Sequence, residues 1–226
     1  MSGSSPAPTG SEAVALVLAG GEPPLAQLLP PLLAGTSLVV AADGGLRHAV
    51  DLGLRPDLLV GDMDSVTARA LDAFPALPTE RHPTAKDELD LELALAAARR
   101  LGATSARVLG AFGGRLDHSL ATLLVAARLA AAEPAFPVSL HGGPHEARVC
   151  TPALPATLAV RPGTTVSLLA LSGDAVASAT GLAYPVVGLR LPFGAGLGVS
   201  NVATGESVDV LCASGAVAVI AEHEPG

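Results

Sequence analysis

The fold of this chain is indicated by the stretch Asp57-Leu58-Leu59-Val60-Gly61-Asp62-Met63-Asp64-Ser65, in which an apolar run stops at two closely spaced carboxylates. The run over residues 57–60 has the length and composition of a buried strand. Side chains two positions apart at the end of a strand point to the same side, so we expect Asp62 and Asp64 to face one space. Their like charges repel by about 4 kcal/mol near a protein surface unless a cation lies between them.

The residue types around these carboxylates indicate which cation fits. Oxygen ligands without a cluster of His or Cys favour Mg²⁺ over zinc. The alternative is structural, because Asp and Ser are common N-caps and one of these side chains could cap the next helix. Ser65 can fill that position alone, which leaves one aspartate to be explained by a ligand.

Short apolar runs alternate with helical patterns over the first two thirds of the chain. The patterns predict strands at 14–19, 37–42, 57–60, 80–82 and 107–109, and helices at 23–33, 46–52, 66–74, 85–101 and 117–132. Strands that alternate with helices indicate a mostly parallel sheet covered on both faces, which is a three-layer α/β/α domain.

The pattern changes near Glu133-Pro134. Short β-like runs, separated by Gly, Pro and Asp, then follow at 138–141, 147–150, 157–160, 165–171, 186–191, 207–212 and 216–221, and no helix is predicted among them. They indicate an all-β domain, a small sandwich or barrel. We expect a loose tail over residues 1–12, an α/β catalytic domain over 13–150 and a β-sandwich domain over 151–226.

The composition excludes several classes of protein. The net charge of −8 argues against a surface that coats nucleic acid. The longest apolar segment, residues 120–132, is too short to cross a membrane and contains Arg128. Cys150 and Cys212 form no CxxC pair and no secreted framework, although a disulfide between them stays open. Because the Ser/Pro/Gly-rich start does not resemble a signal peptide, we expect a cytoplasmic protein.

Three further polar clusters resemble the first in their position. They are Asp43-Gly44-Gly45, Lys86-Asp87-Glu88-Leu89-Asp90 and Gly113-Gly114-Arg115-Leu116-Asp117-His118. Each follows a predicted strand or begins a predicted helix, and in an open α/β sheet such points meet at the carboxyl edge, where ligands bind. Together the four clusters indicate a magnesium-nucleotide site.

The cluster at 86–90 has a functional and a structural interpretation. Asp87 and Asp90 are three apart in the first turn of the predicted helix, where acidic residues are common and Thr84 can cap. Lys86 favours function, because it is the only lysine against twelve arginines and offers a compact ammonium. Codon bias with one chance survivor explains it equally simply.

The glycine-rich loop at 110–115 suits a phosphate. Glycines let backbone N–H groups approach phosphate oxygens, a helix start adds partial positive charge, and Arg115 can grip with two nitrogens. Asp117 can equally be an N-cap, and His118 is either a phosphate contact or a surface histidine. The chain has neither a GxxxxGK[ST] nor a GxGxxG pattern, so it is neither a P-loop protein nor a standard dinucleotide binder.

The β half carries few charges and one tyrosine, Tyr184, in Thr180-Gly181-Leu182-Ala183-Tyr184-Pro185. A lone tyrosine is usually a core or rim residue. In a chain without tryptophan it is also the best flat platform for a cationic ring, worth about 0.5–2 kcal/mol.

These motifs together resemble the thiamine pyrophosphokinase (thiamine diphosphokinase) family. The family is marked by a DGG loop, a GDxDS turn, a DxTD helix start, a GGRxDH loop, a GLxYP-like segment and an SN pair, and all six occur here in order between about residues 14 and 221. One departure is Leu89, which stands where the family has Thr.

The resemblance implies an α/β/α catalytic domain, a thiamine-binding β-sandwich and a homodimer with active sites between subunits. Its reaction moves a pyrophosphoryl group from ATP to the hydroxyethyl oxygen of thiamine, giving thiamine diphosphate and AMP. Mg²⁺ would be held by Asp62, Asp64 and Asp90. The nucleotide and phosphates would be lined by Asp43, Gly44, Gly45, Lys86, Asp87, Gly113, Gly114, Arg115, Asp117 and His118. The resemblance also implies that Tyr184, Ser200 and Asn201 face thiamine, and that they do so from the partner subunit.

Catalysis would rest on Asp62, Asp64, Asp90, Arg115 and Asp117. A general base, where the reaction needs one, is an aspartate of this set, and Asp64, Asp90 and Asp117 all qualify. Two alternatives remain open from sequence: a related diphosphokinase with another alcohol as acceptor, such as a pterin, and a non-catalytic sensor of nucleotide or thiamine diphosphate.

Overall fold

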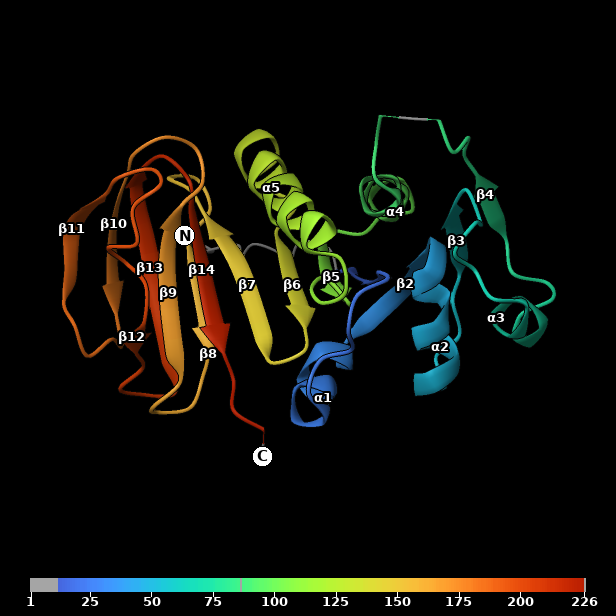
Figure 1. Cartoon of the computed structure of the whole chain (residues 1–226), viewed down its shortest axis with the longest axis horizontal. Helices are drawn as coiled ribbons and strands as arrows, with labels where there is room; N and C mark the ends of the chain where they lie inside the picture. The colour runs from blue at the N-terminus through green and yellow to red at the C-terminus, as the bar shows by residue number, and fades with distance from the viewer. Residues whose placement is uncertain (1–11, 86, 226) are drawn as a thin grey trace, which may run out of the picture.

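The computed structural model describes residues 12–85 and 87–225, so residues 1–11 of the expected tail and Lys86 lie outside the described residues. Within the described ranges, one sheet of ten strands runs along the long axis of the molecule (Figure 1). A second sheet of four strands packs against one end of it. The large sheet is parallel at one end and antiparallel at the other, which divides the molecule into an α/β half and a β half.

The α/β half contains six parallel strands in the order β6-β5-β1-β2-β3-β4. Their bounds are β1 (Val14–Leu18), β2 (Thr36–Ala42), β3 (Leu58–Gly61), β4 (Thr79–Arg81), β5 (Ser105–Leu109) and β6 (Val138–Gly142). The chain first builds outward from β1 to β4 and then returns to the other side of β1. The order therefore reverses between β1 and β5, and ligands of open α/β sheets bind beyond the carboxyl ends of strands at such a point.

Helices cover both faces of the parallel strands. The helices are α1 (Leu29–Leu33), α2 (Leu46–Leu52), α3 (Ala68–Ala73), α4 (Asp90–Arg100) and α5 (Leu116–Ala132). Strand β1 shows how the layers form: Ala15 and Val17 pack with α4 and α5 on one face, and Leu16 and Leu18 pack with α1–α3 on the other. This is the two-residue period of a strand buried on both faces. The predicted three-layer α/β/α arrangement is confirmed.

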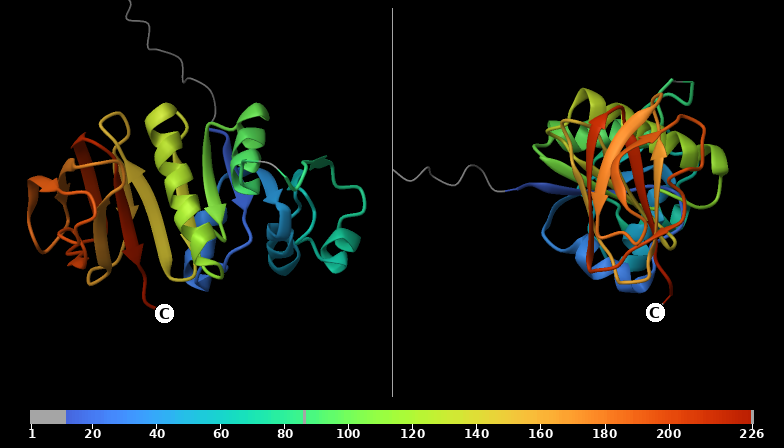
Figure 2. Two further views of the ribbon diagram at one scale, coloured as in Figure 1. Left: turned by 45° about the horizontal axis from the view of Figure 1, so that its top comes forward. Right: turned by 90° about the vertical axis from the view of Figure 1, so that its left-hand side faces the viewer.

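The β half is a sandwich. Its first sheet continues the large sheet through β7 (His145–Cys150), β14 (Val217–Glu222), β9 (Thr165–Ala170) and β12 (Asn201–Val202). Its second sheet contains β11 (Val186–Leu191), β10 (Ala175–Thr180), β13 (Ser207–Ser214) and β8 (Ala156–Ala159). A common apolar core lies between them, and the end-on view in Figure 2 has this β half toward the viewer. The predicted sandwich is confirmed, while the domain boundary at residue 150 stays a prediction because both halves share one sheet.

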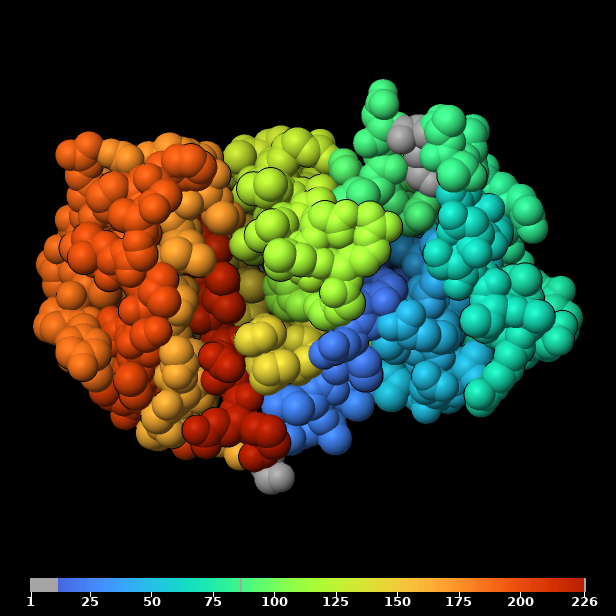
Figure 3. Space-filling model, in the orientation of Figure 1, coloured from blue at the N-terminus to red at the C-terminus, as the bar shows by residue number. Residues whose placement is uncertain are grey.

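The two halves are also joined at the end of the chain. The C-terminal residues lie against the segment before α1 in Figure 3, where the Nε2 of Gln27 donates to the carbonyl of Glu224 at 2.7 Å. Gln27 belongs to a short 3-10 helix, η1 (Ala26–Leu28). The predicted helix at 23–33 therefore starts late, because residues 23–25 pair with Gly143 instead: Leu25 N–H donates to the Gly143 carbonyl at 3.0 Å.

Two other predictions need correction. The helix expected at 85–101 begins only at Asp90, since Leu89 before it is extended, with φ −70° and ψ 149°. Strand β10 was not predicted, because its sequence Ala-Val-Ala-Ser-Ala-Thr offers small side chains and no apolar run. The strand supplies the middle of the second sheet, between β11 and β13. Among the described residues, no helix is both long and apolar enough to span a membrane.

Candidate active site

The Gly61–Ser65 turn brings two carboxylates together at the end of β3. The strand stops at Gly61, and Met63 adopts a left-handed conformation with φ +73°. The backbone N–H of Asp64 donates to Oδ1 of Asp62 at 3.1 Å, and Ser65 Oγ donates to Oδ1 of Asp64 at 2.9 Å. The prediction that the two aspartates share one space is confirmed, but a turn places them there and strand alternation does not.

None of these side chains serves as the N-cap of the following helix. Helix α3 starts at Ala68, and its N-cap is Thr67, whose Oγ1 accepts a hydrogen bond from Ala70 N–H at 3.3 Å. The structural explanation for Asp62, Asp64 and Ser65 is therefore wrong. The carboxylates lie at the carboxyl edge of the sheet, where ligands of open α/β folds bind.

Asp43, at the end of β2, completes a group of three carboxylates. One ligand oxygen from each of Asp43, Asp62 and Asp64 lies within 4.8 Å of the others, the single such group among the described residues. Asp43 has φ +44° and is 7% exposed, and its buried Oδ1 has no hydrogen-bond partner in the described part of the chain. Burial raises the pKa of the Asp43 carboxyl. An oxygen-only group with one unpartnered buried oxygen fits a hard divalent cation such as Mg²⁺.

Three glycines allow this close packing. A Cβ on Gly45 would lie 2.0 Å from the carbonyl oxygen of Leu18, and a Cβ on Gly44 would lie 3.2 Å from Ser65 Cβ. Gly61, with φ +148°, leaves no room either, because its Cβ would lie 2.9 Å from that of Asp43. The glycines of the DGG and GDxDS motifs therefore serve to bring β1, β2 and β3 into contact behind the carboxylates.

Asp90 lies beside the three carboxylates, at the start of α4. A Cβ on Gly61 would lie 3.2 Å from Oδ1 of Asp90, and the Asp90 charge contributes to the raised pKa of Asp43. Asp90 is the first residue of α4 and Asp87 lies exposed in the bend before it. The expectation that both lie in the first turn of the helix is wrong, since the helix starts three residues after Asp87. Leu89 is the N-cap, so Thr84 does not cap this helix.

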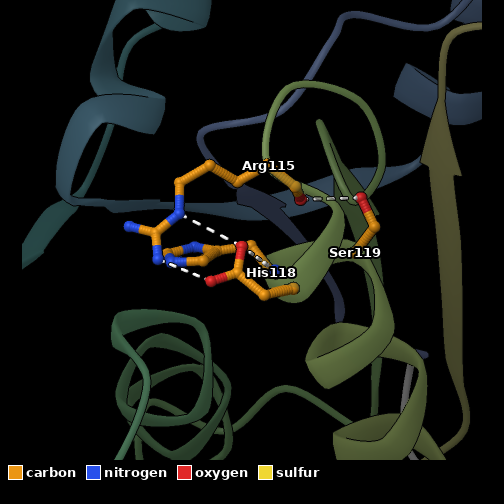
Figure 4. Close-up of polar contacts among 4 residues, drawn as sticks. Arg115, His118 and Ser119 are labelled. Carbon is orange, nitrogen blue, oxygen red and sulfur yellow. Dashed lines mark hydrogen bonds and ion pairs between the residues drawn. The ribbon is translucent and has the colours of Figure 1, made fainter.

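The glycine-rich loop leads into α5 and carries an ion pair. Gly113 and Gly114 have φ +92° and +69°, conformations that glycine adopts readily. Arg115 is the N-cap, so the interpretation of Asp117 as N-cap is wrong. The Arg115 side chain turns back over the first turn of α5 (Figure 4), where Nε and Nη2 donate to the Asp117 carboxylate at 3.1 and 2.6 Å. The side chain of His118 is exposed, and its backbone N–H donates to Asp117 Oδ1 at 3.0 Å.

This ion pair affects the acidity of Asp117. Its hydrogen bonds with Arg115 lower the pKa of the Asp117 carboxyl to about 2. Both side chains are exposed, so solvent screens the pair and it adds little to stability. Arg115 is therefore free to exchange the carboxylate for a phosphate at small cost.

The thiamine-facing residues predicted from sequence lie together in the β half. Tyr184 is 67% exposed in the connection between β10 and β11. Asn201 is buried, and its Nδ2 donates to the Tyr184 carbonyl at 2.8 Å while its Oδ1 accepts from Tyr184 N–H at 3.0 Å. Ser200 is exposed, with φ +63°, and its N–H donates to Ser167 Oγ at 3.1 Å. Tyr184 and Ser200 thus face solvent, whereas the Asn201 amide bonds to the backbone of Tyr184.

Family models identify both halves of the chain. The model for "Thiamin pyrophosphokinase, catalytic domain" matches residues 29–136, and the model for "Thiamin pyrophosphokinase, vitamin B1 binding domain" matches residues 155–217. The two matches occur in the order of the fold and together span about three quarters of the chain. The chain belongs to the thiamin pyrophosphokinase family.

Solved structures of thiamin pyrophosphokinases have the same fold. The structure from Bacillus subtilis is 23% identical, with a TM-score of 0.78, and the match covers 94% of this chain and 99% of that one. The structure from Geobacillus thermodenitrificans is 26% identical, with a TM-score of 0.76 and coverage of 94% and 98%. That from Candida albicans is 16% identical, with a TM-score of 0.77 and coverage of 94% and 90%. A comparison with curated proteins finds no match.

Family membership establishes the activity. The chain is a thiamine diphosphokinase that uses ATP as co-substrate, as the motifs predicted. The match to a vitamin B1 binding domain favours thiamine over a pterin as the acceptor.

The group of three carboxylates and the group around Tyr184 lie far apart within one thiamin pyrophosphokinase chain. The carboxylates follow β2 and β3, at one end of the long axis in Figure 1, and Tyr184 lies between β10 and β11 at the other. The space-filling view in Figure 3 shows the α/β half and the β half at opposite ends of an elongated molecule. The exposed Tyr184 therefore lies remote from the carboxylates of its own chain.

Two residues near the site were missed from sequence. The Nη2 of Arg47 donates to the carbonyls of Gly20 and Gly21, each at 2.6 Å. The buried His48 places its Nε2 3.0 Å from the Gly21 carbonyl, and burial lowers the pKa of this imidazole. Together they hold the loop after β1, whose Gly21 N–H donates to the Gly110 carbonyl at 2.8 Å. Their position directly after the DGG motif is the one signal that the sequence offers.

Proposed function

We propose that this thiamine diphosphokinase binds Mg²⁺ and the phosphates of ATP at Asp43, Asp62 and Asp64, with Asp90 beside them. The observation that carries this proposal is the convergence of three carboxylates from two strand ends, one of them buried with an unpartnered oxygen. A buried carboxylate oxygen without a hydrogen-bond partner is costly, and a divalent cation would offset that cost. Asp43 thus joins the ligand set, to which the motifs alone assigned Asp62, Asp64 and Asp90.

The phosphates are proposed to lie between this group and the glycine-rich loop. Helices α4 and α5 both start at the carboxyl edge of the sheet, so their N-termini add partial positive charge there. Arg115 is exposed and paired only at the surface, so it can turn from Asp117 to a phosphate and grip it with two nitrogens. Gly113 and Gly114 let the backbone approach the same phosphate.

The chemistry requires alignment more than covalent help. The hydroxyethyl oxygen of thiamine attacks the β-phosphorus of ATP, the bond to the α-phosphate oxygen breaks, and AMP leaves. Bound Mg²⁺ would neutralise charge on the phosphate oxygens. The protein holds the two substrates in line and supplies the positive charge of Arg115. While Arg115 is paired with Asp117, a pKa of about 2 makes that carboxyl a poor base. Once Arg115 turns to a phosphate, Asp117 is a candidate for accepting the alcohol proton alongside Asp64 and Asp90.

A shared site in a homodimer follows from the distance between the two groups. Tyr184 cannot serve the carboxylates of its own chain from the opposite end, so a partner chain is proposed to bring its tyrosine. Exposed apolar residues on α5 and in the β half support this. On α5, Leu116, Leu120 and Leu124 are 73, 55 and 56% exposed on one face, directly after Arg115. In the β half, Val187, Phe193 and Leu197 follow Tyr184 in the chain and are also exposed, and they are proposed as the second apolar set.

Paired around a two-fold axis, each set would cover the other and complete two equivalent sites. Light scattering on the purified protein should give the mass of a dimer. Leu120→Glu, which puts a charge on the α5 face, should shift it to a monomer. A monomeric wild type that is fully active would contradict the shared site.

A cytoplasmic location is proposed as well. The reaction consumes ATP, and Cys150 and Cys212 are both free thiols buried in the sandwich core. Free thiols in this arrangement are typical of a reducing compartment.

The product of the reaction tests the proposal. With ATP, Mg²⁺ and thiamine, the enzyme should release AMP in step with thiamine diphosphate, and a chelator should stop both. ADP as the product would contradict pyrophosphoryl transfer. A panel of other alcohols, pterins included, tests the acceptor. Asp62→Asn serves as the matched control, since a sensor would keep its ligand affinity in this variant and an enzyme would lose turnover.

A further inference from the structure

Asn201 makes contacts that differ from those of a substrate ligand. The side chain is 8% exposed. Its Oδ1 accepts hydrogen bonds from the N–H groups of Tyr184 at 3.0 Å and Val202 at 2.8 Å, and its Nδ2 donates to the Tyr184 carbonyl at 2.8 Å. An amide oxygen has two acceptor sites and its nitrogen two donors, so these bonds use three of the four. Most of the hydrogen-bonding capacity of Asn201 is therefore directed at the backbone.

The connection that carries Tyr184 is held on one side by the same segment. Ala183 N–H donates to the Val202 carbonyl at 2.8 Å, and Thr204 N–H donates to the Gly181 carbonyl at 2.9 Å. Leu182 and Ala203 form an isolated β-bridge. The backbone up to Ala183 is thus paired like a short strand, and Asn201 continues this pairing by one residue at Tyr184. The ring of Tyr184 meanwhile stays largely exposed.

We infer that Asn201 is a positioning residue, which fixes the backbone of Tyr184 so that its ring presents a flat face to thiamine. The inference rests on the proposed function, in which Tyr184 faces thiamine. An exposed ring on a mobile loop would lose conformational freedom whenever thiamine binds, and the Asn201 bonds remove that cost beforehand. Asn suits the role because one planar group accepts from the N–H and donates to the carbonyl of the same residue. Asp can only accept, and Ala does neither.

The sequence provides an internal reporter for this inference. Tyr184 is the only tyrosine and the chain has no tryptophan, so tyrosine fluorescence reports this one residue. In Asn201→Ala the fluorescence anisotropy of Tyr184 should fall, while the melting temperature stays close to that of the wild type. The KM for thiamine should rise about tenfold, the value expected for the loss of one or two hydrogen bonds. The KM for ATP should change by less than about twofold, because the hydrogen bonds between Asn201 and the Tyr184 backbone lie far from the proposed phosphate site.

A double-mutant cycle separates positioning from direct contact. If Asn201 acts through Tyr184, then Asn201→Ala should raise the thiamine KM little further in a Tyr184→Ala background. Additive effects of the two changes would overturn the inference and make Asn201 a thiamine ligand. The matched control is Thr204→Ala, which removes an exposed side chain from the same pairing and keeps the backbone bond; it should behave as wild type.

Two further outcomes are informative. If Asn201→Ala does not fold, Asn201→Asp keeps the shape and the two acceptor bonds but sets an anionic oxygen against the Tyr184 carbonyl in place of the donor. Unchanged anisotropy and unchanged thiamine KM in that variant would overturn the inference. A wild-type enzyme that neither turns over thiamine nor changes its tyrosine fluorescence on thiamine addition would refute the proposed function itself. The two failures are thus distinguishable.

Discussion

The carboxylate end of the molecule, with Asp43, Asp62 and Asp64, and the tyrosine end, with Tyr184, differ in which part of the residue is buried. At the carboxylate end, the reactive group is buried: Asp43 is 7% exposed, has φ +44° and keeps one oxygen without a partner among the described residues. At the tyrosine end the ring is exposed and the backbone behind it is tightly hydrogen-bonded. The first arrangement gathers negative charge, which a divalent cation would balance. The second exposes an aromatic ring on a fixed backbone, which a cationic ring or a partner surface would cover.

The comparison predicts the largest loss at the carboxylate end. Asp62→Asn should lower kcat by about 10²–10³-fold, the usual effect of removing one preorganised electrostatic group. The fold should be kept, because the change removes repulsion within the group and no apolar contact. Steady-state AMP release measures it, with Asp72→Asn on the exposed face of α3 as control. Retention of most activity in Asp62→Asn would mean that the carboxylates do not serve the reaction.

Arg115 tests whether the glycine-rich loop belongs to the same end. Arg115→Ala should lower kcat about a hundredfold, and Arg115→Lys should restore part of it, since an ammonium keeps the charge and loses the two-nitrogen grip. The matched control is Arg190→Ala, because Arg190 forms a similar exposed pair with Asp174 in the β half. Equal effects of the two alanine variants on turnover would argue against a role for Arg115 in phosphate binding.

The region where the parallel and antiparallel strands of the large sheet meet, at β6 and β7, should make the free energy of unfolding depend on pH. His141 on β6 is buried, and burial lowers its pKa from 6.5 to about 4. Below pH 6.5 the unfolded chain binds a proton that the folded chain refuses, so stability falls with falling pH. Between pH 6.5 and 5 this costs about 2 kcal/mol. The charged and titratable groups that act on His141 are Glu146, Arg148, Arg107 and His223.

Urea unfolding at several pH values measures this slope. His141→Asn should flatten it, and His118→Asn at the surface should leave it unchanged. Part of the slope should survive in His141→Asn, because burial also lowers the pKa of His48 with the same sign. If the slope of unfolding free energy against pH were unchanged in His141→Asn, burial would not keep the proton off the His141 imidazole in the folded chain.

The smallest effect is expected at the tyrosine end. Tyr184→Ala should raise the thiamine KM by about tenfold, within the range of a cation–π contact, and leave the ATP KM and the melting temperature unchanged. Tyr184→Phe should keep most of the affinity because it keeps the ring. A fall in kcat with no change in thiamine KM would show that the Tyr184 ring does not contribute to thiamine binding.

The sequence predicted the carboxylate end better than the tyrosine end, for physical reasons. Strands buried on both faces appear in the sequence as apolar runs. The acidic residues that follow β3 are not needed as helix N-caps, because Thr67 caps the next helix. The turn at Met63 and the left-handed Asp43 could not be predicted, because they depend on contacts between β2 and β3 that lie far apart in sequence. Asp43 was therefore assigned to the nucleotide and not to the metal group.

At the tyrosine end, pattern and structure diverge more. Asn201 was expected to face thiamine, and only the folded chain shows its amide bonded to the backbone of Tyr184, which lies 17 positions away. Strand β10 escaped prediction because small residues give no periodic signal. The start of α4 was misplaced because Asp87 and Glu88 favour a helix N-terminus that the extended Leu89 delays.

The carboxylates of one chain and the tyrosine of another are proposed to form one active site. Asp62→Asn should be nearly inactive, and Tyr184→Arg should be as well at thiamine concentrations well below its KM, because it sets a second cation against thiamine. The two variants can be co-expressed with different tags and purified through both, so that every dimer carries one chain of each kind. Such a dimer has one intact site and one that carries both changes. The account predicts about half of the wild-type AMP release per dimer. Activity no higher than that of either parent would show that each chain completes its own site.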